Sequence, residues 1–164
     1  MGNVSLRTED CRRVGLYNPA FGSIAKFYHV DRDFGLRCLK AGLTGVHDRE
    51  LRGEHILIRA LPSFLKNSRA QGVGLVGLHR LHGDIIGPFS IDSITNDLPP
   101  PARQLIRATH RHVVYRSLIG GCSIWIRAAG MLRLTALQLP AAKLARKAEQ
   151  LRGARDALQE TSSM

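Results

Sequence analysis

The sequence predicts a small α+β domain in which an irregular N-terminal part, residues 1–97, precedes a helical C-terminal part, residues 98–164. Two observations predict this division. Glycine and proline interrupt the first part too often for long elements, whereas helical spacing of apolar residues becomes clear only after the prolines at 99–101. Because 164 residues is the usual size of one domain, we treat the two parts as halves of a single domain.

Two short helices are expected in the N-terminal part. Ser23 is a suitable N-cap for the first, and Asp33 for the second, which would end near Gly42. Short strands are expected at residues 56–58, ended by Pro62, and at residues 89–91. Between Gly72 and Gly87 the glycines recur so often that this segment is predicted to be loop and turn.

A basic amphipathic helix is predicted after the triple proline, ending at Gly120 and Gly121. Its apolar positions have helical spacing, and arginines recur every four residues on an adjacent face. Such spacing would align guanidinium groups along one side of the helix, where they can follow a phosphate backbone. The predicted nucleic-acid-binding residues are Arg103, Arg107, Arg111 and Arg116.

The mostly apolar stretch at residues 118–139 has the length of a membrane span, but Arg127 and Arg133 oppose that interpretation. A buried or interfacial segment is expected instead. A last helix is predicted to begin at Pro140 and to carry leucines at heptad spacing. Pairing of two copies through this helix would use Leu144, Leu151 and Leu158.

Positive charge is concentrated in one segment of the chain. Of 24 basic residues, 19 are arginine, and the formal net charge is +11. Residues 98–148 contain nine basic side chains and no acidic one. A field of this sign attracts nucleic acid, anionic membrane or acidic protein without choosing between them. An arginine excess also arises from GC-rich coding sequence without selection for binding.

Motifs for chemistry are not supported by their context. Residues 72–77 match GxGxxG, but no strand precedes them and Gly83 interrupts the helix that should follow. Two close histidine pairs, His79 with His82 and His110 with His112, lack a complete ligand set for a metal. The three cysteines form no CxxC pair and are expected to be reduced thiols. No catalytic motif, cofactor site, metal site or small-molecule substrate is therefore predicted.

Three hypotheses of function follow from these features. The first is a small basic accessory protein that binds nucleic acid or another polyanion without sequence specificity. The second is an interaction protein whose 118–158 region lies on an anionic membrane or pairs with a partner helix. The third is a reading frame without evolved function. Because the N-terminus has no secretory signal pattern, a cytoplasmic location is expected, with peripheral membrane association left open.

Overall fold

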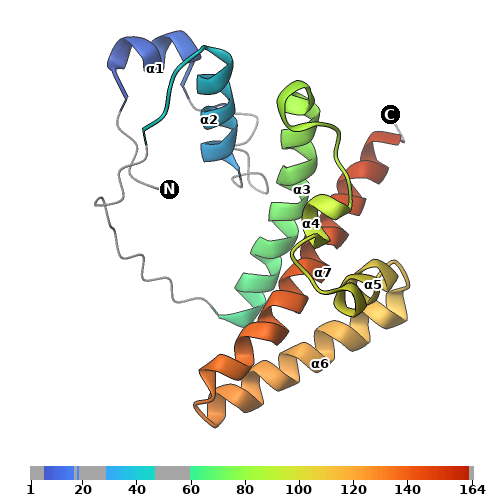
Figure 1. Ribbon diagram of the computed structural model, residues 1–164. Coiled ribbons are helices and arrows are strands. Elements are labelled where there is room, and N and C mark those ends of the chain that lie inside the picture. Colours follow the sequence, from blue (N-terminus) through green and yellow to red (C-terminus); the bar gives the residue numbers. More distant parts are fainter. Residues whose placement is uncertain (1–5, 17, 19–28, 47–59, 163–164) are drawn as a thin grey trace.

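The computed structural model describes residues 6–16, 18, 29–46 and 60–162, and the elements in these ranges are all helices (Figure 1). Helix accounts for 79% of the structure, with no strand among the described residues, so the predicted α+β class is wrong. The helices are α1 (Thr8–Val14), α2 (Val30–Lys40), α3 (Leu61–Ile86), α4 (Asp92–Thr95), α5 (Pro100–Ala108), α6 (His112–Met131) and α7 (Thr135–Ser162).

Helix α3 is the main departure from the sequence-based prediction. Its residues include the segment from Gly72 onward that was expected to be loop, and Pro62 lies in its first turn instead of ending a strand. A helix interior rich in glycine is unfavourable in isolation, so packing must supply the stability that propensity does not. The predicted strand at residues 89–91 is irregular chain leading into α4, while residues 56–58 and the helix at Ser23 lie outside the described residues.

The packing that stabilises α3 is its crossing with α7, and both helices run in the same direction (Figure 1). A Cβ atom placed on Gly72 would lie 1.8 Å from the carbonyl oxygen of Gln150, and one on Gly153 would lie 2.0 Å from that of Arg69. The two backbones therefore approach more closely than any side chain at these positions would permit. The glycines that argued against a helix are what permits the contact.

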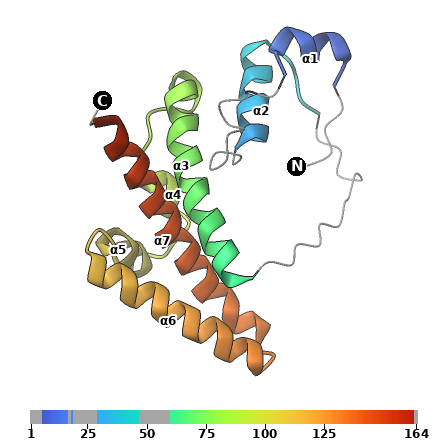
Figure 2. The same ribbon diagram turned by 180° about the vertical axis from the view of Figure 1, so that it is seen from behind.

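The core lies around this crossing. Val76 from α3, Leu151 from α7 and Ile106 from α5 are almost completely buried in one cluster, together with residues of the α4 segment. A second cluster joins α6 to α7 through Cys122 and Ala145, with Leu65 of α3 packed against it. Helices α6 and α7 form a hairpin whose turn lies at the end of the molecule remote from α1 and α2 (Figure 2).

The predicted boundaries of the C-terminal helices also need correction. The chain turns at residues 109–111, so the expected single helix is two helices, α5 and α6. Helix α6 continues through Gly120 and Gly121, where a stop was predicted, and α7 begins at Thr135, with Pro140 inside it. The second N-terminal helix is confirmed as α2, although it is capped by His29 and not by Asp33.

Candidate functional site

The four predicted nucleic-acid-binding arginines do not lie along one helix. Arg103 and Arg107 are in α5, Arg111 is the N-cap of α6, and Arg116 lies within α6. The turn at residues 109–111 separates the first pair from the second because it redirects the chain between the two helices (Figure 1). The continuous row of guanidinium groups expected from the sequence is therefore absent.

Two of these arginines have structural partners. Arg103 donates hydrogen bonds to the backbone oxygens of Asn96 and Leu98, at 3.2 and 3.3 Å, and Arg107 forms an ion pair with Asp92. These contacts connect α5 to the segment before it, which contains α4. Arg111 and Arg116 are exposed. Arg111 and Arg116 could therefore contact a polyanion without any change in α5. Arg103 and Arg107 would have to give up the contacts that attach α5 to the preceding segment.

The leucine row of the last helix is divided between the core and the surface. Leu151 has 0% exposure in the main cluster, and Leu144 packs against both clusters. Leu158 is 40% exposed. The structure thus uses the middle of the row within a single chain, and pairing of two copies through all three leucines would require the core to open.

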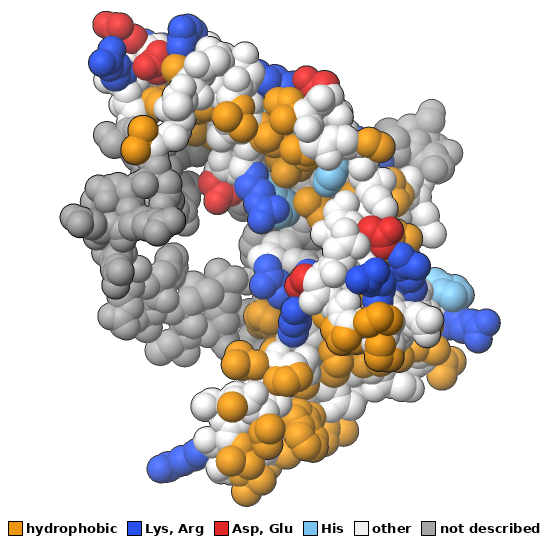
Figure 3. Space-filling model, viewed as in Figure 1, with side chains coloured by type: hydrophobic (Ala, Val, Ile, Leu, Met, Phe, Trp, Pro, Cys, Tyr) orange, Lys and Arg blue, Asp and Glu red, His pale blue; other side chains and the backbone are white. Residues whose placement is uncertain are grey.

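Large apolar side chains are exposed at the end of the molecule formed by the α6–α7 turn (Figure 3). We call this surface the apolar tip. Met131 is 80% exposed, Leu139 70% and Leu132 69%. Exposed apolar surface of this extent marks sites of interaction with proteins or membranes more often than chance placement does. The tip consists of Ile124, Trp125, Met131, Leu132, Leu134, Leu137 and Leu139.

Hydrogen bonds across the hairpin hold the tip in shape. The indole Nε1 of Trp125 donates to the backbone oxygen of Leu137 at 2.8 Å, and the amide of Gln138 donates to the backbone oxygen of Ile126 at 2.8 Å. Arg133 has a φ of +56° in the turn between the helices. These contacts fix the start of α7 against the end of α6, so the apolar side chains are presented on an ordered hairpin.

Basic side chains border the tip in the described part of the chain. Arg127 and Arg133 are exposed beside the apolar side chains, and no acidic residue occurs between positions 98 and 148. An apolar surface with a basic border matches the chemistry of an anionic membrane surface. None of the helices in the described part of the chain is long and apolar enough to cross a bilayer.

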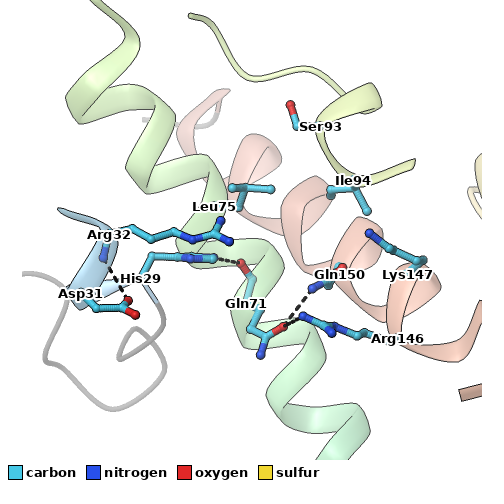
Figure 4. Close-up of a pocket in the computed structure, with 10 residues that line it drawn as sticks. All are labelled: His29, Asp31, Arg32, Gln71, Leu75, Ser93, Ile94, Arg146, Lys147 and Gln150. Atoms are coloured by element: carbon cyan, nitrogen blue, oxygen red, sulfur yellow. Dashed lines mark hydrogen bonds between the residues drawn. The ribbon is translucent and has the colours of Figure 1, made fainter. Parts of the chain in front are cut away.

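A polar pocket lies elsewhere, between α2, α3, the α4 segment and α7, with a volume of about 350 Å³ (Figure 4). Its basic side chains are Arg32, Arg146 and Lys147, and among the described residues that line it Asp31 is the only acidic one. The pocket draws on helices distant in sequence, so no local pattern signalled it. Its lining residues are His29, Asp31, Arg32, Gln71, Leu75, Ser93, Ile94, Arg146, Lys147 and Gln150.

Three of the four paired histidines contact other residues of the fold. His82 is buried and its Nε2 lies 2.8 Å from Oδ1 of Asp33, while Nδ1 of His79 lies 2.9 Å from the backbone oxygen of Gly87. His110 Nδ1 lies 3.2 Å from the backbone oxygen of Arg107. Within the described ranges, no three His, Cys, Asp or Glu side chains are grouped so as to hold a metal ion.

The GxGxxG match has no phosphate-binding geometry. Its residues lie in the middle of α3 and not in a loop before a helix, so their backbone N–H groups are within the helix. Gly72 within it serves the contact with α7. Comparison of the chain with family models, curated proteins and solved structures gives no match.

Proposed function

We propose that the protein binds peripherally to anionic membranes, with the apolar tip inserted into the interface. The single observation that carries this proposal is the exposure of seven large apolar side chains on one ordered hairpin. Inserting such side chains among lipid chains removes apolar area from water, which is favourable by roughly 25 cal/mol per Å². Membrane insertion would therefore account for a surface that is costly to expose to water.

Charge favours an anionic membrane over a second copy of the chain. Arg127 and Arg133 border the tip, and each arginine near an anionic bilayer contributes about 1 kcal/mol. A tip-to-tip dimer would instead bring the arginines of two copies toward each other, and residues 98–148 supply no carboxylate to pair with them. The tip also includes Trp125, a residue type enriched at the membrane–water interface.

Nucleic-acid binding has weaker geometric support. That hypothesis depended on four aligned arginines, and two of them are engaged by the α4 segment. Nucleic-acid binding stays a prediction, and the exposed Arg111 and Arg116 are the predicted residues still available for it. The tip, by contrast, needs no rearrangement to meet a membrane.

Vesicle flotation tests the proposal. The full chain should float with vesicles of phosphatidylcholine and phosphatidylserine, and much less with phosphatidylcholine alone, because the arginines contribute only at a charged surface. Replacing Leu132 and Leu139 by serine should abolish flotation. The matched control replaces Leu16 and Leu39, which are 69% and 60% exposed on the far side of the fold, and should float as the native chain does.

Three outcomes would contradict the proposal. The first is the absence of flotation with either vesicle at low salt. The second is a concentration-dependent dimer in sedimentation experiments that the tip substitution removes, since this would identify a second copy as the partner of the tip. An equal loss of flotation in the control would show that general hydrophobicity, and not the tip, causes the binding.

A further inference from the structure

A polar pocket lies between α2, α3, the α4 segment and α7, away from the apolar tip. We propose that this pocket binds a phosphate monoester, carried either by a soluble molecule or by a lipid head group. The proposal does not depend on the apolar tip, which lies at the α6–α7 turn. On α7, Arg146 follows Leu139 of the tip by seven residues, or about 10 Å along the helix.

Positive charge lines two sides of the pocket. Arg32 extends from α2 and Arg146 from α7, on opposite sides of Gln71 (Figure 4). Neither guanidinium forms an ion pair with a described residue, whereas Lys147 is held 2.9 Å from Asp97. Asp31 is partly occupied, because its Oδ1 accepts the backbone N–H of Arg32 at 2.9 Å. The two guanidinium groups thus supply positive charge that the described chain leaves unneutralised.

The guanidinium groups of the pocket have a geometry that suits phosphate, and Arg146 is held in place by Gln71. A guanidinium group presents several N–H donors in a planar fork that fits phosphate oxygens. Oε1 of Gln71 accepts hydrogen bonds from Arg146, at 3.3 Å, and from Gln150, at 2.9 Å. These bonds orient Arg146 in the free protein, so less conformational freedom is lost when an anion binds.

One wall of the pocket is formed by the rigid crossing of α3 with α7. Gln71 and Gln150 stand beside the closest contact of α3 with α7, where the backbone of Gln150 lies against Gly72. Two helices in backbone contact cannot shift without breaking the core. Sites built on rigid elements hold their groups more accurately than sites built on loops.

The backbone is strained at His29, which lines the pocket. This residue has a φ of +80°, in the left-handed region that residues other than glycine rarely adopt. The strain is held by its ring, whose Nε2 lies 3.1 Å from the backbone oxygen of Gln71. Strained residues concentrate at binding and catalytic sites. Burial is the main cause that lowers the pKa of His29; the hydrogen bond with the Gln71 backbone and the charge of Asp31 oppose this shift, while Arg32 and Arg146 add to it.

The size of the pocket sets the class of ligand. Its volume of about 350 Å³ is roughly ten times the 30 Å³ that one molecule of liquid water occupies. A lone phosphate would leave much of this space filled with solvent. A phosphate attached to a small polar group fits better, and Ser93, Gln71 and Gln150 offer hydrogen-bonding groups to it.

Calorimetric titration of the full chain with inorganic phosphate and with glycerol 3-phosphate tests the inference without any membrane. Saturable binding is expected, tighter for the monoester. Arg32→Gln and Arg146→Gln should each weaken it at least about tenfold, because each removes a charged hydrogen-bond donor. The control is Arg12→Gln, which changes the same charge at an exposed position of α1 and should leave the affinity unchanged.

The source of the phosphate is decided by a second arm, flotation with phosphatidylcholine vesicles containing phosphatidylinositol 4-phosphate. Flotation that Arg32→Gln weakens, while binding to phosphatidylserine vesicles persists, identifies a lipid head group. Binding in solution without this effect identifies a soluble ligand. The Leu132 and Leu139 substitutions should leave calorimetric binding intact, so failure of the membrane proposal is recognised separately.

The inference is overturned if neither phosphate compound binds saturably at millimolar concentration and the pocket variants float on the phosphoinositide vesicles as the native chain does. It is also overturned if Arg12→Gln loses as much affinity as Arg32→Gln, since binding would then follow net charge. Circular dichroism of each variant confirms that the helices are retained.

Discussion

At the scale of single residues, Gly72 and Gly153 determine how closely α3 and α7 approach. Each would place a Cβ atom within 2.0 Å of a carbonyl oxygen on the other helix. Neither contact can be relieved by a side-chain rotation, because the obstructing atoms belong to the backbone. The helices would have to separate, and the buried side chains between them would lose contact.

Substituting alanine for Gly72 should lower the free energy of unfolding by about 3 kcal/mol, at the upper end of the range for overpacked cores. The comparison is Gly121→Ala, because that glycine lies in the interior of α6 with no atom within 4 Å of the added Cβ. Chemical denaturation followed by circular dichroism measures both. Equal stabilities of the two variants would contradict the close crossing.

The buried ring of His29 predicts a dependence of stability on pH. Its pKa in the folded chain is lowered from 6.5, mainly by burial. As the pH falls below 6.5, the unfolded chain takes up a proton that the folded chain does not, so this histidine makes the protein less stable in acid. Replacing His29 by asparagine, which tolerates a positive φ, should reduce the loss of stability between pH 7.5 and 5.5. Urea denaturation at the two pH values is the measurement, and an unchanged difference would contradict it.

At the scale of elements, α1 and α2 are attached to α3 by a small number of polar contacts. Asp33 is buried, accepts a bond from Arg37 and lies 2.8 Å from Nε2 of His82. A second pair joins Lys40 to Asp84 at 2.9 Å, and it lowers the pKa of Asp84. The buried pair is the more important of the two, since an exposed pair contributes little.

Asp33→Ala should therefore release α1 and α2 from α3, because it leaves His82 and Arg37 without their shared partner. Limited proteolysis should cut the chain before α3 faster in this variant, while the part containing α3 to α7 stays resistant. Asp84→Ala is the control and should be cut at nearly the native rate. Uniform susceptibility along the whole chain would show that Asp33 supports the entire fold.

Helix α6 illustrates what could and could not be predicted from sequence. The apolar stretch at 118–139 was expected to be buried or interfacial, and its far end contributes to the exposed tip. The sequence-based prediction ended this helix too early, because glycine has a low helix propensity and Gly120 and Gly121 therefore indicated a helix end. Alanine at Gly120 and Gly121 together should raise the free energy of unfolding by about 2 kcal/mol, since each glycine costs about 1 kcal/mol in a helix interior and neither position is crowded. A fall in the thermal midpoint would contradict this.

The sequence misled most where contacts between distant segments decide the structure. Helix α2 was recognised from a local pattern, whereas the segment from Gly72 was not, because its stability comes from Gln150 and its neighbours on α7. The polar pocket was missed for the same reason, since only the fold brings Arg32 and Arg146 to the same pocket. The prediction of a continuous row of arginines on one helix was wrong because no glycine or proline marks the turn at residues 109–111.

At the scale of the whole molecule, the apolar tip and the acidic residues of α1 and α2 lie at opposite ends (Figure 1). The tip lies in a segment without carboxylates, whereas Asp10, Asp31, Asp33 and Asp84 are on α1, α2 and the end of α3. This asymmetry would orient the protein at a charged surface, with the α6–α7 turn facing the membrane. Raising the salt concentration should weaken binding without abolishing it, because salt screens the arginines and leaves the apolar contribution.

The only tryptophan of the chain lies in the tip, so its fluorescence should report membrane binding directly. Adding phosphatidylserine vesicles should shift the emission of Trp125 to shorter wavelength and protect it from acrylamide, because the indole enters a less polar medium. Vesicles with brominated acyl chains should quench it. An unshifted spectrum under conditions where the protein floats would place the bilayer contact elsewhere.

The distance in sequence between the two crossing helices has a consequence for biosynthesis. Gln71 and Gln150 are 79 positions apart, and α7 is the last helix of the described chain. A ribosome must therefore add about 79 residues after Gln71 before the glycine-rich α3 meets the surface that stabilises it. Until then the nascent chain exposes apolar residues destined for the core, and exposed apolar surface of this kind promotes aggregation.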